Sequence, residues 1–274
     1  MIGTIYTVLF TLDGKDPSKN KYVDMFFIWF LFLKKFGDVS NTNICLYIDT
    51  TTMEYLKTID RFNNILSNCQ VFPFPSPSSL MEGMKRRYIV AQNFQNTNPG
   101  QLYMYMDLDV LVYKPLSILL NTSNTDKLFY IHTEENLFGL AGNILSDNYV
   151  GTRISFTDKE KESFQHMGGI SSGLFAWHHM NSEFSEFFKN ILDTIQNDYQ
   201  KYYTVDQPYF NEAVLRYIPN ELVCVMDSHL IGFNQIYKDI ETIPYVLINY
   251  AGEPGDDSLH FSKLLEAYSL VFQD

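Results

Sequence analysis

The chain has few cysteines, a minority of basic residues and no long apolar run, and each shortage excludes a class of protein. Its three cysteines, Cys45, Cys69 and Cys224, are far apart and odd in number. They predict buried, reduced thiols, because neither a disulfide framework nor a zinc cluster fits that spacing. With 20 basic and 32 acidic residues, the net charge is −12. A field of that sign repels polyanions, so we expect no nucleic-acid partner.

The apolar run Met25–Leu33 (MFFIWFLFL) bears on membrane association. A bilayer span takes about 20 residues, so this run predicts a buried core helix, with peripheral membrane contact as the alternative. A secretion signal would place its apolar stretch nearer the first residue, whereas a strand over Ile5–Leu12 is expected there. We therefore expect no integral membrane segment and a soluble, cytoplasmic protein.

What the sequence does contain is typical of a globular α/β protein: 274 residues, 46% hydrophobic and 16% aromatic. Strands are expected at Ile5–Leu12, Asn43–Asp49, Gln70–Phe74 and Leu102–Tyr113, and helices at 25–36, Met53–Leu66 and Leu80–Phe94. This alternation predicts one domain with a central, mostly parallel sheet flanked by helices. In the second half, strands are expected at 129–132, 173–177, 222–226 and 246–249, and helices at 183–199, 205–214 and 259–268. Residues 137–168 are the expected irregular insert.

Two carboxylates, Asp107 and Asp109, lie within the apolar run Leu102–Tyr113. On a strand, residues two apart point to the same side, so both acids are expected to converge. Side by side they would repel, and a hard divalent cation with oxygen ligands removes that conflict while bridging to a diphosphate. The alternative is that both acids cap neighbouring helices or pair with Lys or Arg.

The run Tyr103–Leu116 (YMYMDLDVLVYKPL) resembles the Asp-x-Asp strand of GT-A fold glycosyltransferases, especially the glycogenin-like family 8. Three further segments follow in that family's order: Met84–Ala91 resembles its basic helix, Ser171–Trp177 its sugar-pocket segment, and Asp206–Val214 its Asp-Gln-x-x-x-Asn helix start. The resemblance implies a single GT-A type domain, with residues 1–115 as the nucleotide-binding half and 116–274 as the acceptor and catalytic half.

The resemblance also implies roles for individual residues. Asp206 and Gln207 would flank the anomeric carbon of the donor sugar, Asp206 as a nucleophile or as a stabiliser of an oxocarbenium-like centre. The alternative for Asp206 is that it caps the following helix together with Thr204. The expected donor-binding residues are Thr11, Leu12 and Tyr22 around the base, Arg86, Asp107 and Lys263 at the diphosphate, and Ser172 and Gly173 at the sugar.

The family's third metal ligand, a histidine, has no match in this chain. Asn249 occupies its place, and an amide oxygen is a weaker ligand for a hard cation than a carboxylate is. The alternatives for that ligand are His260 and Asp256, while Asp107 and Asp109 remain the first two.

Together these features predict a metal-dependent glycosyltransferase that moves a sugar from a nucleotide-diphosphate donor to a glycan or other hydroxyl acceptor, with retention of configuration. Mn²⁺, or else Mg²⁺, is the expected metal, and a UDP-sugar the expected donor, with guanosine as the next choice of base. Two other functions stay open at this point. One is a haloacid-dehalogenase-like phosphatase, whose nucleophile also lies in an Asp-x-Asp after an apolar strand. The other is a non-catalytic module that binds a nucleotide sugar or glycan.

Overall fold

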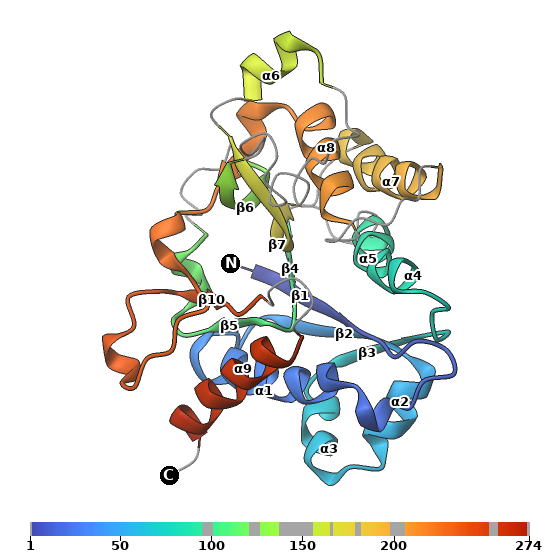
Figure 1. Ribbon diagram of the computed structural model, residues 1–274, viewed down its shortest axis with the longest axis vertical. Coiled ribbons are helices and arrows are strands. Elements are labelled where there is room, and N and C mark those ends of the chain that lie inside the picture. Colours follow the sequence, from blue (N-terminus) through green and yellow to red (C-terminus); the bar gives the residue numbers. More distant parts are fainter. Residues whose placement is uncertain are drawn as a thin grey trace.

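The computed structural model shows a layered α/β arrangement (Figure 1). It describes residues 2–94, 101–120, 127–136, 156–164, 167–178, 182–197, 206–251 and 257–272. Residues 137–155, most of the expected irregular insert, lie outside these ranges.

The central sheet has seven strands in the order β3-β2-β1-β4-β7-β6-β8. Its first half consists of β1 (Ile2–Leu9), β2 (Asn43–Asp49), β3 (Gln70–Phe74) and β4 (Leu102–Met106), which are parallel to one another. The second half consists of β7 (Gly168–His178), β6 (Phe129–Asn136) and β8 (Val223–Val225). Here β7 is antiparallel to both β4 and β6, whereas β8 is parallel to β6. The predicted fold class, a mostly parallel sheet with helices on both faces, is confirmed.

Helices cover the two faces of this sheet (Figure 1). On one face lie α1 (Lys21–Phe36), α3 (Asp60–Ser67) and α9 (Asp257–Phe272), and on the other α5 (Arg86–Phe94), α7 (Ser182–Asn197) and α8 (Gln207–Tyr217). The shorter helices are α2 (Thr50–Lys57), α4 (Leu80–Met84) and α6 (Asp158–Phe164), with 3₁₀ turns at Pro17–Lys19, Leu116–Ile118, Asn220–Leu222, Ser228–Leu230 and Ile240–Thr242.

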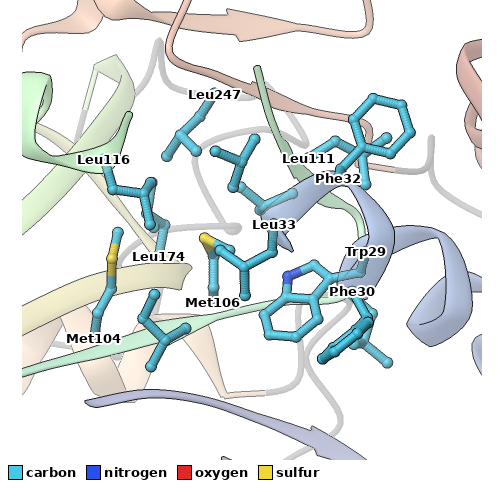
Figure 2. Close-up of a cluster of buried hydrophobic side chains, with 14 of the residues drawn as sticks. Trp29, Phe30, Phe32, Leu33, Met104, Met106, Leu111, Leu116, Leu174 and Leu247 are labelled. Carbon is cyan, nitrogen blue, oxygen red and sulfur yellow. The ribbon is translucent and has the colours of Figure 1, made fainter. Parts of the chain in front are cut away.

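Strand β4 shows how its sequence divides the core into two clusters. Met104 and Met106 point toward α1, where they pack with Trp29 and Leu33 (Figure 2). The alternate tyrosines, 103 and 105, point to the opposite face and pack under α5, α7 and α8. Because successive strand residues face opposite sides, the run LYMYM places thioethers in one core and aromatic rings in the other.

Helix α1 contains the apolar run Met25–Leu33 and is largely buried, which confirms the prediction of a core helix. It begins where the Asn20 side chain accepts a hydrogen bond from the Tyr22 amide and ends at Gly37. In the part of the chain that the structure describes, no helix combines the length and apolar character that crossing a membrane requires.

The strand expected over Ile5–Leu12 lies at Ile2–Leu9, and three other expected elements are each divided in two. The strand predicted over Leu102–Tyr113 ends at Met106, and β5 (Val110–Val112) leaves for a second, three-stranded sheet with β10 (Leu247–Asn249) and β9 (Ile231–Phe233). The helix predicted over Met53–Leu66 is two helices, α2 and α3. The helix predicted over Leu80–Phe94 is likewise two, because α4 ends at Met84 and a new helix begins at Arg86.

Candidate functional site

A cavity of about 540 Å³ opens at the carboxyl ends of β1 and β4, the edge where open α/β sheets bind ligands. It is lined by residues of three stretches that are distant in sequence: Val8, Leu9, Phe10, Thr11, Leu12, Lys15, Asp16, Lys19, Asn20 and Tyr22; Leu80, Gly83, Met84 and Arg87; and Tyr105, Asp107, Leu108 and Asp109. Five of the predicted site residues therefore share one cavity: Thr11, Leu12, Tyr22, Asp107 and Asp109.

The two aspartates converge in a turn, and not along a strand as the sequence suggested. Strand β4 ends at Met106, and the Val110 amide donates a hydrogen bond to the Asp107 carbonyl, 3.2 Å away. The Asp107 amide donates to the Gly173 carbonyl at 2.8 Å, which fixes the start of the turn on β7. Its end is fixed on β10, because the Asp109 carbonyl accepts from the Tyr250 amide at 2.9 Å.

Negative charge accumulates at this turn. Burial raises the pKa of Asp107 above its ordinary value, and the charges of Asp109 and Asp206 raise it further, while Arg87 opposes them. Burial likewise raises the pKa of Asp109, and the charge of Glu134 raises it further. Tyr105 donates its hydroxyl to Asp107 as a hydrogen bond. Two half-buried carboxylates that disfavour each other's charged form provide a site for a cation.

The cation that the protein itself supplies is Arg87, at the start of α5. Its side chain is only 2% exposed, and Nη1 lies 3.4 Å from Oδ2 of Asp107 and 2.9 Å from the Ser172 carbonyl. The guanidinium also lies over the Tyr105 ring, 4.8 Å from its centroid. By contrast, Arg86, the arginine that the sequence favoured, lies over Phe74 and is not among the residues lining the cavity.

Asp206 lies behind Arg87 and not on the cavity wall. Its side chain is completely buried, Oδ2 is 3.5 Å from Nε of Arg87, and the Tyr88 hydroxyl donates to the same oxygen. Burial, and then the charge of Asp206, raise the pKa of Tyr88 well above its ordinary value, so this hydroxyl remains a neutral donor. Asp206 precedes α8, yet its side chain makes no capping hydrogen bond there. Asp206 therefore occupies the N-cap position without capping α8 through its side chain, and Thr204, the other residue of that alternative, lies outside the described residues.

The start of α8 is fastened to β7 by two side chains of the predicted Asp-Gln-x-x-x-Asn motif. Gln207 accepts a hydrogen bond from the Ser172 amide at 3.1 Å. Asn211, fully buried, accepts from the Ile170 amide at 2.8 Å and donates to the Ile170 carbonyl at 2.7 Å. Gly173 directly follows Ser172 in β7, and its carbonyl accepts the hydrogen bond from the Asp107 amide. The predicted sugar-pocket segment thus joins the predicted motif helix and the aspartate turn.

Thr11 also lines the cavity, and its hydrogen bonds determine whether its hydroxyl can donate or accept. Its hydroxyl oxygen accepts hydrogen bonds from Asn20 Nδ2 at 2.9 Å and from the Thr52 hydroxyl at 2.7 Å. Its amide donates to Asp49 at 2.9 Å. Both lone pairs of the hydroxyl are thereby occupied, which leaves its proton to donate. Nothing in the sequence pattern indicated this arrangement, because it depends on the end of β2 and the start of α2 meeting the segment that follows β1.

The remaining predicted site residues lie elsewhere. Asn249, at the end of β10, is adjacent to the aspartate turn, but its amide oxygen accepts from the Ala251 amide at 3.0 Å and its nitrogen donates to Glu134 at 3.3 Å. Lys263 is half-buried on α9, outside the set of residues that line the cavity. His260 is on the same helix, but its side chain lies outside the described residues. Asp256 lies outside the described residues altogether.

The residues at the turn fit a hard divalent cation. Within the described ranges, no three His, Cys, Asp or Glu side chains are arranged to hold a metal. Asp107 and Asp109 nevertheless offer carboxylate oxygens, and Mg²⁺-like ions are commonly bound by one or two carboxylates together with substrate phosphates. Two protein carboxylates facing an open cavity are consistent with that mode of binding.

Comparison with known proteins finds similarity in structure only. No protein-family model matches the sequence, and no curated protein matches it significantly. Among solved structures, the apo WbbM bifunctional glycosyltransferase has a TM-score of 0.59 at 12% identity, covering 97% of this chain and 49% of that one. The galactosyltransferase LgtC, in complex with donor and acceptor sugar analogues, has a TM-score of 0.59 at 11% identity, covering 97% and 94%. The glycosyltransferase GlyE of Streptococcus pneumoniae TIGR4 has a TM-score of 0.55 at 11% identity, covering 97% and 60%.

This chain spans about half the length of the WbbM structure and nearly all of LgtC. At such low identity the likeness concerns the fold, which therefore agrees with the GT-A type that the four sequence motifs predict. The chain has the fold of these glycosyltransferases.

Proposed function

We propose that this chain is a metal-dependent glycosyltransferase that moves a sugar from a nucleotide-diphosphate donor to a glycan or other hydroxyl acceptor. The observation that carries the proposal is the cavity, whose wall includes Asp107 and Asp109 together with Thr11 and Tyr22. Within a glycosyltransferase fold, such a cavity has a wall for the diphosphate and a wall for the base.

Uridine is the base that the Thr11 end favours. The Thr11 hydroxyl has only its proton to offer, so it complements a base with a carbonyl oxygen and not one with an exocyclic amine at that edge. Guanine also presents a carbonyl oxygen and is the next choice. Tyr22, 43% exposed on the cavity wall, offers a ring against which the base can stack.

Asp107 and Asp109 would hold the metal, Mn²⁺ or else Mg²⁺. When bound, such an ion neutralises diphosphate charge and stabilises the departing nucleotide. Arg87 would take the phosphate-facing role that the sequence gave to Arg86, since it is Arg87 that lines the cavity. Lys15 and Lys19, two further cations on the wall, would draw the donor toward the site.

Gln207 and Ser172 define where the sugar would lie. Neither lines the cavity, but both belong to the hydrogen-bond network that joins α8, β7 and Arg87 beside the aspartate turn. We expect retention of configuration, with the acceptor hydroxyl attacking from the face that the nucleotide leaves. In this proposal Arg87 stabilises the developing charge on the leaving group.

The competing functions predict different behaviour. The Asp-x-Asp follows β4, whereas the phosphatase alternative places its motif after the first strand. The structural neighbours are also glycosyltransferases, which leaves no observation in favour of that alternative. A non-catalytic module would bind the same ligands without turnover.

The decisive experiment is calorimetric titration with uridine, guanosine, adenosine and cytidine diphosphates, with and without Mn²⁺, followed by a donor-hydrolysis assay. We expect metal-dependent binding of uridine diphosphate that is lost in Asp109→Asn and kept in Asp193→Asn, a matched substitution of an exposed residue on α7. Binding without turnover of any donor would support the module. Absence of metal-dependent binding by every nucleotide would overturn the proposal.

A further inference from the structure

Arg87 is held between two carboxylates that come from different halves of the chain. Asp107 directly follows β4 and lines the cavity. Asp206 directly precedes α8 and is completely buried. Nη1 of Arg87 is 3.4 Å from Asp107 and Nε is 3.5 Å from Asp206. A single buried guanidinium therefore connects the cavity wall to the helix behind it.

Each part of this arrangement is fixed from a separate element. Nη1 donates to the Ser172 carbonyl on β7 at 2.9 Å, and the Arg87 carbonyl accepts from the Tyr6 hydroxyl on β1 at 2.8 Å. Nη2 is 3.1 Å from the Met84 sulfur. A side chain as long as arginine loses considerable rotamer freedom when it is held in this way, so the surrounding contacts must favour one position strongly.

The burial of Asp206 rules out direct contact with a ligand in this conformation. The residue has no exposed surface, and its Oδ2 accepts from the Tyr88 hydroxyl. A nucleophile or an oxocarbenium stabiliser must reach the anomeric carbon, which a carboxylate covered by Tyr88 and Arg87 does not do. A charge this deep is retained only where it is paired, and its charged partner is Arg87.

We propose that Asp206 is a positioning residue that acts through Arg87 and makes no contact with the donor sugar. This inference rests on the proposed function. Asp206 holds Nε, and thereby keeps the Nη1 edge of the guanidinium directed to Asp107 and the cavity. Without the Asp206 charge, Arg87 has one carboxylate partner, Asp107, and its charge shifts toward that side chain and away from the phosphates.

A double-mutant cycle on nucleotide affinity tests this role. Asp206→Asn, Arg87→Met and the double variant are titrated with uridine diphosphate and Mn²⁺, and transfer is measured as KM and kcat. We expect Asp206→Asn to weaken affinity about ten- to a hundredfold, because the buried guanidinium loses one of the two carboxylates that it pairs with. In the Arg87→Met background it should weaken affinity no further, because the pathway through Arg87 is already absent.

If Asp206 attacked the sugar directly, its loss would affect kcat and not nucleotide affinity. Asp206→Asn would then leave nucleotide affinity unchanged and abolish kcat, and a covalent glycosyl adduct on Asp206 would be detectable by mass spectrometry. Either finding overturns the proposal. Should Asp206→Asn not fold, Tyr88→Phe removes only the hydroxyl that holds Asp206. We expect it to lower nucleotide affinity as well, and unchanged affinity in that variant would also overturn the positioning role.

A second measurement needs no ligand and separates this inference from the proposed function. In the ¹⁵N-labelled protein, the Nε–H signal of Arg87 can be assigned by its disappearance in Arg87→Met. We expect this signal to shift in Asp206→Asn and to stay in place in Asp193→Asn. If the signal is unchanged in Asp206→Asn, the inference fails, even where the wild type binds nucleotide. If the signal shifts but no nucleotide binds, the linkage of Asp206 to Arg87 stands and the proposed function fails.

Discussion

Asp107 occupies the space in which a side chain at residue 173 would lie. A Cβ added to Gly173 would be 2.7 Å from Oδ2 of Asp107, closer than real Cβ contacts come. The same glycine accepts the Asp107 amide hydrogen bond through its carbonyl, at 2.8 Å. The glycine of the sugar-pocket segment is therefore required by the position of an aspartate from the other half of the chain.

Gly173→Ala is expected to displace the Asp107 carboxylate and so to weaken metal-dependent nucleotide binding, by about tenfold or more if one charge-assisted contact is lost. Calorimetry with uridine diphosphate and Mn²⁺ measures this. The fold should persist, because the residue is on a strand with ordinary backbone angles and the clash involves a side-chain oxygen. Gly232→Ala, at a strand glycine outside the cavity lining where an added Cβ would also be 2.7 Å from a side-chain atom, of Tyr245, serves as the matched control. Unchanged nucleotide affinity in Gly173→Ala would show that Asp107 does not depend on this space.

The aspartate turn predicts an unusual dependence of stability on pH. Burial, followed by the neighbouring acids, raises the pKa of Asp107 from 3.8 to about 7 and that of Asp109 to about 6. Between the unfolded and folded pKa values the folded protein binds more protons, so metal-free stability falls as pH rises from about 4 to 7. Asp109→Asn should flatten this fall, which urea unfolding at several pH values would measure. An equally steep fall of stability in Asp109→Asn would contradict the raised pKa of Asp109. In the wild type, added Mn²⁺ should reverse the fall of stability with pH.

The base end of the cavity gives a prediction about Tyr22. Its replacement by alanine removes the stacking surface, and base–aromatic stacking contributes about 1–3 kcal/mol, so nucleotide affinity should fall about tenfold or more. Tyr22→Phe keeps the ring and should bind normally. The matched control is Tyr217→Ala, which truncates a tyrosine of similar exposure at the end of α8. Calorimetry compares the three. Equal affinity in Tyr22→Ala and wild type would place the base elsewhere.

The apolar runs of the sequence predicted β1 to β4 and a mostly parallel sheet, whereas the family resemblance, and no local pattern, put Thr11 and Tyr22 with Asp107 at the donor site. An apolar run ending in acids marks a strand end, and parallel strands bring their carboxyl ends to one edge. What local pattern could not show was the path of the chain after Met106. Residues Asp107–Val110 form a turn because β5 pairs with β10, more than 130 residues later in the sequence, as the Asn249–Val110 register shows.

The choice between Arg86 and Arg87 was also beyond the sequence. Adjacent residues on a helix point about 100° apart, so only the exact start of α5 decides which one faces the cavity. The sequence suggested one continuous helix over Leu80–Phe94. The break after Met84 changes the direction in which each arginine points from the helix axis. The burial of Asp206 likewise depends on Tyr88 and Arg87 packing over it, a contact between residues more than 110 positions apart.

Asn211 should be among the most sensitive positions for stability, although it makes no contact with the cavity. Its fully buried amide bonds both the amide and the carbonyl of Ile170, so alanine would leave two buried backbone groups without partners. An unsatisfied buried group costs about 1–3 kcal/mol, and we expect Asn211→Ala to lose about 2–4 kcal/mol of unfolding free energy.

Urea unfolding of the ligand-free protein measures this loss, with Asn63→Ala, at an exposed asparagine on α3, as the matched control. Asn211→Asp separates the two bonds, because a carboxylate still accepts from the Ile170 amide but no longer donates to the carbonyl. At neutral pH it should cost at least as much as alanine, because a fully buried carboxylate would face the Ile170 and Gln207 carbonyl oxygens. The same series should also weaken nucleotide binding, since Asn211 fixes α8 on β7 and thereby the position of Asp206 behind Arg87. If Asn211→Ala unfolds at the same urea concentration as Asn63→Ala, then the Asn211 hydrogen bonds contribute nothing measurable to holding α8 on β7.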